Sequence, residues 1–493
     1  MKKILIGAAL IASAATAANA ADLPRKAPVY KAPILQVYDW TGFYIGVNAG
    51  GSVGRDLTSN AINSAAPFSN ERTHLSPAGA IGGGQIGYNW QFRNFYNLVL
   101  GVEADIQAAG QRDSACIGGC IVGAPQLTTL NKEIDWFGTA RVRAGIATGP
   151  VLTYVTAGYA YGHVTTSGVN VLAGDTIRLS SDRTRGGFVV GSGVEASIGG
   201  NWTAKIEYLY LDLSTDRLFG AAPITTFAQT SRTRDNIFRA GLNYRIGGNS
   251  GYSEPVANWS GFYLGGNAGS GIARNKSSTA FVGFPPPVTF TLVPDGYLGG
   301  VQAGYNWQAA AWVFGVEADI QGQSLRDNKA CILFSGCIVT PLNNGTTGFF
   351  GNTYDQKMPW LGTVRGRIGY SVGSTLFYGT AGFAYGQTKT TLNEINLGVG
   401  PAFVANTTQR FEFKKSKGGY VVGAGIESPL KFFGLFGPNW TTKTEYLYVD
   451  LGTTRTTFTD ASLLPQTFTT RTQEHIFRTG INYHFNTPVV AKY

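Results

Sequence analysis

The residues of this chain best suited to chemistry are two acidic pairs in identical surroundings. Glu103 and Asp105 stand two positions apart in Gly101-Val-Glu-Ala-Asp-Ile-Gln, and the same seven residues return with Glu317 and Asp319. A spacing of two puts both carboxylates on one face of a β-strand. Such a pair could divide the roles of general acid and general base. The alternative, which we favour, is a ladder of ion pairs with basic residues on neighbouring strands.

Other catalytic or cofactor motifs are weak in this sequence. Its histidines are His74, His163, His475 and His484. None of the four is repeated at the matching position of the other copy of the internal repeat, so repeated positions cannot supply a Ser-His-Asp triad. His74 could ligate hemin, but we prefer to interpret it as a solvated loop residue. The run Gly82–Gly87 fits the dinucleotide motif G-x-G-x-x-G, yet no helix follows it and the second copy breaks it. We expect no enzyme, no cofactor and no metal site.

The four cysteines fall in equivalent segments of the two copies. They are Cys116 and Cys120 in the first copy, and Cys331 and Cys337 in the second. In an exported chain, close pairs of this kind indicate local disulfides. Metal binding is the alternative, but neither a histidine nor a paired-cysteine motif stands nearby.

The duplication extends beyond these residues to almost the whole chain. Trp40-Thr-Gly-Phe-Tyr-Ile-Gly returns from Trp259, and the segment 201–213 returns at 439–451. A repeat of this length is a domain rather than a solenoid unit. Around the acidic pairs the pattern alternates, with Val102, Ala104 and Ile106 opposite the carboxylates. This period of two indicates β-strands.

Each copy contains about eight such strands, since mixed short and long connections separate the alternating runs. In the first copy we place them at 40–51, 80–92, 96–109, 134–148, 151–164, 184–199, 201–214 and 233–246. Tight turns near 93–94, 149–150 and 199–200 alternate with long polar loops at 52–79, 110–133, 165–183 and 215–232. Short turns on one side and long loops on the other are typical of an outer-membrane β-barrel. The fold class predicted is all-β, a transmembrane antiparallel β-barrel.

Tryptophan placement argues against a soluble β-sandwich. Four repeat-related pairs stand at predicted strand ends: 40/259, 90/307, 136/360 and 202/440. Aromatic residues at both ends of the strands form the girdles of a membrane barrel.

The chain's beginning indicates export. Met1-Lys-Lys, an apolar run and Ala18-Asn-Ala20 predict a secretory signal peptide over 1–20, cleaved between Ala20 and Ala21. We further predict a disordered periplasmic spacer at 21–38, barrel repeats at 39–247 and 258–485, a linker at 248–257 and a tail at 486–493. Beyond the signal no apolar run reaches the ~20 residues of a spanning helix.

The inward-facing charges of each copy nearly balance. In the first copy they are Glu103, Asp105, Glu195 and Glu207 against Arg141, Arg143, Lys205, Arg239 and Arg245. In the second they are Glu317, Asp319, Glu427 and Glu445 against Arg365, Arg367, Lys443 and Arg478. A register that pairs 103 with 143 and 105 with 141, and likewise 317 with 367 and 319 with 365, would match acids to bases. Since eight strands enclose a lumen that side chains just fill, we favour two tandem eight-stranded barrels. The alternative is one sixteen-stranded barrel with an aqueous channel.

A family resemblance agrees with this interpretation. The Trp-Thr-Gly-Phe-Tyr and Gly-Val-Glu-Ala-Asp motifs, Arg141-Val-Arg-Ala-Gly and Asn201-Trp-Thr-Ala-Lys resemble the small outer-membrane β-barrel surface proteins of alphaproteobacteria. The last strand, 478–485, resembles the terminal insertion signal read by the barrel-assembly machinery. The resemblance implies a porin-like surface antigen, with hemin binding known among relatives and no catalytic residues to carry over. Family members usually have one such unit, and this chain has two.

Composition narrows the partners. The formal charge is +10, but only 14% of residues are charged, which disfavours nucleic acid and favours anionic lipid or polysaccharide. Basic residues at the strand ends near the long loops suggest contacts to lipopolysaccharide phosphates, with ordinary solvation as the alternative: Arg183, Arg185, Arg232, Arg234, Lys414, Lys415, Lys417 and Arg471. We expect a structural, porin-like protein. The alternatives are a sixteen-stranded diffusion porin for small solutes, or a hemin-binding or adhesive receptor acting through its loops.

Overall fold

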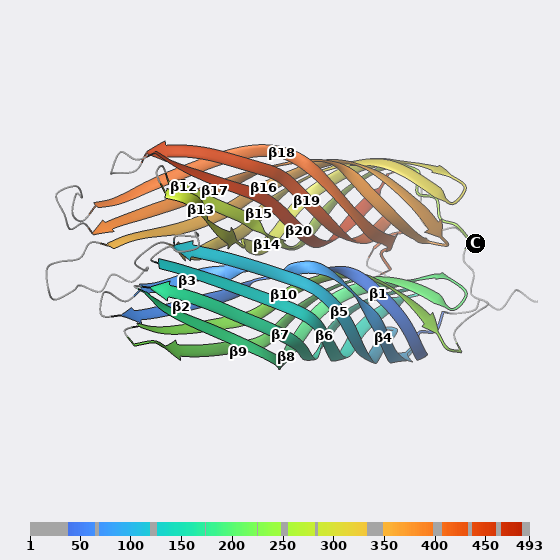
Figure 1. The fold of residues 1–493 in the computed structure, drawn as a ribbon. Helices are drawn as coiled ribbons and strands as arrows, with labels where there is room; N and C mark the ends of the chain where they lie inside the picture. Colours follow the sequence, from blue (N-terminus) through green and yellow to red (C-terminus); the bar gives the residue numbers. More distant parts are fainter. Residues whose placement is uncertain are drawn as a thin grey trace, which may run out of the picture. The chain divides into compact units, whose positions relative to one another are not determined.

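The computed structural model describes residues 38–64, 69–118, 126–172, 174–223, 225–247, 255–281, 284–332, 349–397, 407–431, 436–459 and 465–485. These residues form antiparallel strands joined by turns (Figure 1). Among them no helix is long and apolar enough to cross a membrane.

The first repeat closes on itself as a barrel. Neighbours pair in chain order from β4 to β10, and β1 pairs with both β4 and β10, so no edge is left open. β2 continues β1 along β10 after a break at Arg55, and β3 pairs with β2. The strands are β1 (Gly42–Gly54), β2 (Asp56–Ser64), β3 (Ser69–Leu75), β4 (Ala78–Phe92), β5 (Leu98–Gly118), β6 (Gln126–Thr148), β7 (Val151–Leu172), β8 (Asp175–Gly199), β9 (Trp202–Ala221) and β10 (Thr225–Arg245).

The second repeat closes in the same way. β11 pairs with β14 and with β20, and β14 to β20 pair in order. β12 pairs with β13 and β20. The strands are β11 (Gly261–Ala273), β12 (Asn275–Phe281), β13 (Phe284–Leu292), β14 (Asp295–Ala309), β15 (Trp312–Ile332), β16 (Phe349–Val372), β17 (Thr375–Leu397), β18 (Thr407–Pro429), β19 (Trp440–Thr459) and β20 (Pro465–His484).

These closures decide between the two architectures predicted from the sequence. In a sixteen-stranded barrel β10 would pair with β11. Instead Val47 on β1 lies directly opposite Leu242 on β10, and Asn267 on β11 lies opposite Gly480 on β20. The chain therefore folds as two tandem eight-stranded barrels, and the single large barrel is wrong. Pro77 and Pro294, which cannot donate to a ladder, stand at the matching breaks before β4 and β14.

The strands are longer than the sequence pattern predicted. β6 has 23 residues and β8 has 25, whereas ~9–11 tilted residues cross a bilayer. Much of the segments expected to be long polar loops is strand that extends each barrel wall on that side. Outward residues there, such as Thr226 and Thr230 of β10, are polar. The backbone ladder continues while the hydrophobic alternation ends, and this is why the prediction stopped short.

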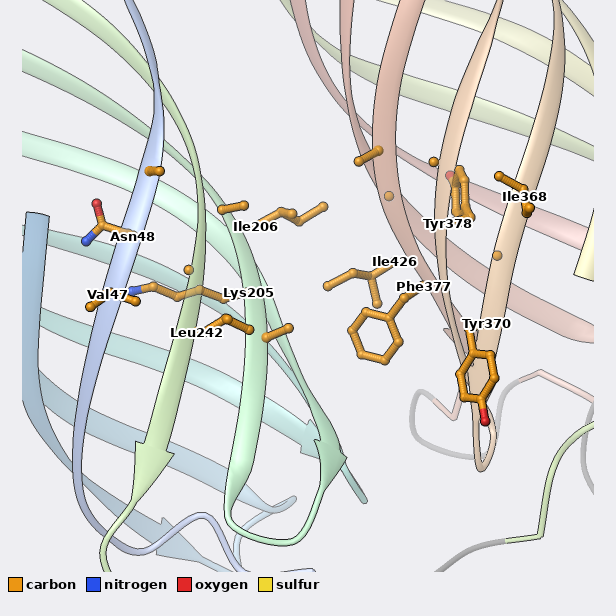
Figure 2. A pocket seen from close by; sticks show the side chains of 18 of the residues that line it. Val47, Asn48, Lys205, Ile206, Leu242, Ile368, Tyr370, Phe377, Tyr378 and Ile426 are labelled. Carbon is orange, nitrogen blue, oxygen red and sulfur yellow. The ribbon is translucent and has the colours of Figure 1, made fainter. Parts of the chain in front are cut away.

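Inward and outward faces follow the predicted alternation. On β5, Val102 and Ile106 are exposed while Glu103 and Asp105 are buried. Figure 2 shows the same on β9, where Lys205 and Ile206 leave opposite sides of the strand. An outward apolar belt of this kind is what a barrel presents to lipid.

The aromatic girdle is confirmed for three of the four tryptophan pairs. Trp90, Trp202 and Trp307 are about half exposed, and Trp136, Trp360 and Trp440 are partly exposed. The prediction is wrong for Trp40 and Trp259, whose exposed fraction is 0%. These two precede the first strand of each barrel and fold inward.

Candidate functional site

The lumen of the first barrel contains a buried cluster of four acids and four bases. Arg141 on β6 contacts Glu103 and lies 2.9 Å from Asp105 on the adjacent β5, and it also lies 3.0 Å from Glu207 on β9. Because β9 is not a neighbour of β6, this guanidinium spans the lumen. Every member is nearly inaccessible, with side chains at most 2% exposed.

Other bases complete the cluster from further strands. Lys205 Nζ lies 2.9 Å from Glu103, and Arg239 Nη2 lies 3.0 Å from Asp105 and 2.6 Å from Glu207. Arg143 Nη1 lies 2.9 Å from Glu195. Buried ions need partners of this quality to offset their desolvation. The predicted ion-pair interpretation of Glu103 and Asp105 is therefore what the structure shows.

The second barrel repeats the cluster closely. Arg365 contacts Glu317 and lies 2.9 Å from Asp319, and Lys443 Nζ lies 2.7 Å from Glu317. The remaining pairs are Arg365–Glu445 at 3.3 Å, Arg478–Asp319 at 2.9 Å, and Arg367–Glu427 at 3.0 Å. The predicted set is thus brought together in each barrel, with one exception.

That exception is Arg245. It lies at the end of β10, donates to the Asp39 carbonyl oxygen, and stacks over the rings of Tyr38 at 5.0 Å and Trp40 at 5.5 Å. It is a partner of the N-terminal segment rather than of the lumen carboxylates. Its counterpart in the second barrel is His484, which lies 3.5 Å from Glu427.

The predicted register between the acidic and basic strands is wrong by two residues. Glu103 lies opposite Arg141, and Asp105 lies opposite Thr139. In the second barrel Glu317 likewise lies opposite Arg365. A slip of two residues keeps every side chain on its face, so the face pattern cannot detect it.

Two tyrosines per barrel, missed from the sequence, complete the cluster. Tyr44 donates to Glu103 over 2.8 Å, and Tyr154 donates to Glu207 over 2.9 Å. Arg143 stacks against both rings, 4.7 and 5.2 Å from their centroids. A side chain at Gly87 would collide with the Tyr44 hydroxyl, so this inward glycine leaves room for the ring. Inward tyrosines near inward glycines are the signal that could have found them.

The inward tryptophan closes the short-turn end of each lumen. Trp40 packs with Val99 and Leu152, which face inward from β5 and β7. Its indole donates to the Gly149 carbonyl over 3.0 Å. Trp259 takes the same place in the second barrel and donates to Ser371 over 3.0 Å. On the short-turn side of the ion-pair cluster, the indole of Trp40 therefore closes the first lumen and that of Trp259 closes the second.

Beyond the outer aromatic residues, one buried pair differs between the copies. Lys132 lies 2.8 Å from Asp56, and both side chains are 0% exposed. Burial raises the pKa of Asp56, although the ammonium beside it acts in the opposite direction. At the matching positions the second barrel has the neutral pair Asn275 and Gln356, joined by a hydrogen bond of 2.6 Å.

The remaining predicted residues have mixed outcomes. His74 is 2% exposed, so the interpretation as a solvated loop residue is wrong. Residues 1–37, which include Ala20 and Ala21, lie outside the described residues, as do Cys120 and Cys337. The signal cleavage and the two loop disulfides stay predictions. Among the described residues no group of three or more His, Cys, Asp and Glu side chains is placed to hold a metal ion.

Comparison with known proteins agrees with this geometry. The family described as outer membrane protein beta-barrel domain matches residues 6–245 and again 251–485. The chain belongs to this family. The 31 kDa outer-membrane immunogenic protein of Brucella melitensis is 36% identical over 261 residues, covering 50% of this chain and 100% of that protein. The 22 kDa outer membrane protein of Rhizobium leguminosarum bv. viciae is 32% identical, covering 40% of this chain and 66% of that protein.

Membership in the outer-membrane β-barrel family fixes the location of the protein. It is an integral outer-membrane protein that contains two family domains in tandem. Among solved structures, Neisserial surface protein A covers 42% of this chain and 98% of its own, with 14% identity and a TM-score of 0.21. That score is too low to inform the argument.

Proposed function

We propose that the protein is a non-enzymatic, structural surface protein whose two closed barrels anchor its loop-side extensions in the outer membrane. One observation supports this most: ion pairs link non-adjacent strands across each lumen, as Arg141 does from β6 to Glu207 on β9. A passive pore needs open water at this level. The relatives' designation as immunogenic supports a role at the cell surface.

The same cluster argues against catalysis by the acidic pairs. Glu103 and Asp105 are saturated by bases and by hydroxyl donors, including Thr139 at 2.7 Å. A catalytic carboxylate must reach a substrate, and these side chains are at most 2% exposed. The hemin alternative gains nothing from His74, because that side chain is buried.

Conductance of the refolded full chain in a planar lipid bilayer tests the proposal. We expect small or absent current steps, because the ion-pair cluster and the indole of Trp40 obstruct the first lumen and their counterparts obstruct the second. A sixteen-stranded general porin in the same bilayer is the positive control. Large, regular steps from this chain would contradict closed barrels.

We also propose that the outer rim contacts lipopolysaccharide phosphates. Several predicted rim bases already have acidic partners, such as Arg232 with Asp212 at 2.7 Å and Arg471 with Asp450 at 2.7 Å. Arg183, in contrast, is exposed and has no ion pair with any described residue. Lys415 is in the same situation on β18. Guanidinium and ammonium groups of this kind suit phosphate.

Retention of lipopolysaccharide during purification tests this second proposal. Arg183→Gln combined with Lys415→Gln should lower retention, whereas Arg232→Gln combined with Arg471→Gln should lower it less. If all eight rim bases are replaced by Gln and lipopolysaccharide retention is unchanged, the proposal that the rim binds lipopolysaccharide is wrong.

A further inference from the structure

The outer lumens of the two barrels are built differently, although their ion-pair clusters match. At four inward positions the first barrel has a smaller or more polar residue than the second, as the repeat and the strand ladders align them. The pairs are Gly168/Leu392, Gln229/Phe468, Thr73/Phe290 and Leu130/Tyr354. The duplicated fold thus provides its own comparison.

In the second barrel this region is packed with aromatic rings. The Phe290 and Tyr354 centroids lie 4.7 Å apart, and those of Tyr354 and Phe468 lie 5.6 Å apart. Polar groups among them are satisfied: the Tyr354 hydroxyl bonds Thr279 over 2.7 Å. These rings fill the part of the lumen where the first barrel has Gly168 and Gln229, and close packing of this kind leaves little room for water.

In the first barrel the same region contains buried amides without partners. Asn60 on β2 lies directly opposite Gln229 on β10, and they are 0% and 1% exposed. Neither amide oxygen nor amide nitrogen of these two residues makes a hydrogen bond within the protein.

Gly168 leaves open the space that the Gln229 amide enters. A side chain at Gly168 would collide with the Gln229 amide oxygen, 2.6 Å away, and would meet the Phe227 ring at 3.3 Å. The second barrel fills this position with Leu392. Unpaired buried amides are costly, and natural proteins satisfy them with internal water that makes about three hydrogen bonds.

We propose that the outer lumen of the first barrel is a binding site for ordered water molecules held by Asn60 and Gln229, and that the ring-filled region at the same level of the second barrel is dry. Water suits the site because one molecule can both donate to an amide oxygen and accept from an amide nitrogen. The Ser231 hydroxyl, 3.0 Å from Lys132 Nζ, joins the site to the Asp56–Lys132 ion pair.

Radiolytic footprinting of the refolded full chain in lipid vesicles tests the proposal. X-ray pulses make hydroxyl radicals from water, and a radical made from held water oxidises the apolar side chains beside it. Leu130 and Phe227, each 0% exposed, should be oxidised. Tyr354 and Phe468, at 2% and 3% exposed, should not be oxidised in the same sample.

Internal controls distinguish oxidation by ordered internal water from oxidation that follows transient opening of the barrel. Phe137 and Leu209 lie in a buried cluster of the same barrel, away from the amides, and should stay unmodified. Gln229→Phe installs the second barrel's residue and should remove the oxidation of Leu130. Equal oxidation in both barrels, no oxidation of Leu130 and Phe227, or oxidation of Phe137 at the same rate would each overturn the proposal.

Discussion

Removing one base from the lumen cluster should destabilise only the barrel that contains it. The perturbation is Arg141→Met, which retains an apolar stem and deletes the guanidinium. Three carboxylates, Glu103, Asp105 and Glu207, then lose a partner within 3.0 Å. The balance of four acids and four bases becomes four against three, in a region with almost no access to bulk water.

The magnitude follows from burial. Breaking a buried pair by removing one partner costs about 3–5 kcal/mol, because the remaining charge stays desolvated. The rim pair Arg232–Asp212 is the matched comparison, since its 2.7 Å contact is similar but the arginine is 45% exposed. Although the Asp212 side chain is 4% exposed, it keeps Arg234 at 3.5 Å when Arg232 is removed, so Arg232→Met should cost less than Arg141→Met.

Urea unfolding in lipid vesicles, followed by tryptophan fluorescence, measures the difference. With a slope of about 1–3 kcal/mol per molar urea, a cost of about 3–5 kcal/mol should lower the midpoint of the first barrel by about 1–5 M in Arg141→Met. Arg365→Met should do the same to the second barrel, because its cluster is nearly identical. Each variant should split the transition in two.

The refuting result is specific. If Arg141→Met and Arg232→Met shift the midpoint equally, the lumen charges are solvated, and the lumen is an aqueous passage. The barrels would then not be closed, and the proposed structural role would be wrong as well.

Three further outcomes are expected. Asp56→Asn alone strands the buried Lys132 and should cost about 3–5 kcal/mol, whereas adding Lys132→Gln recreates the second barrel's neutral pair and should restore stability in the same urea titration. Val47→Cys with Leu242→Cys, which face each other across β1 and β10, should form a disulfide visible by electrophoresis without reductant; failure to crosslink while Val47→Cys links to the second repeat would contradict the closure. Trp40→Ala removes a fully buried indole and should cost about 3–5 kcal/mol, and an unchanged unfolding midpoint would show that it does not plug the lumen.

Much of the fold was predictable because period-two alternation survives wherever one face meets lipid. Val102 and Ile106 on the outside, with Glu103 and Asp105 on the inside, are placed as the pattern predicts. The pattern failed beyond the outer aromatic residues, where outward residues meet water and no longer need to be apolar. The strands continue there on backbone hydrogen bonds and on inward packing, as at Leu130 and Phe227, without the outward apolar residues that a lipid-facing strand shows.

Trp40 shows a second limit. A tryptophan at a strand end fits a girdle and a plug equally well from sequence. The choice depends on whether the chain before β1 turns under the lumen, toward Val99 and Leu152, or outward to lipid. That is a property of the backbone path, and the residues around Trp40 do not encode it in any periodic pattern.

Alternation and repetition are enough to place the two acidic pairs on inward faces, to put bases in the same lumen, and to show that the arrangement occurs twice. Which base meets which acid depends on the folded barrel, because a two-residue slip preserves every face. It also decided that β1 pairs with β10, since closure is a choice between edges with equal hydrogen-bonding capacity. Circular closure brought Glu207 on β9 across to Arg141 on β6, and thereby made isolated charges into one neutral cluster.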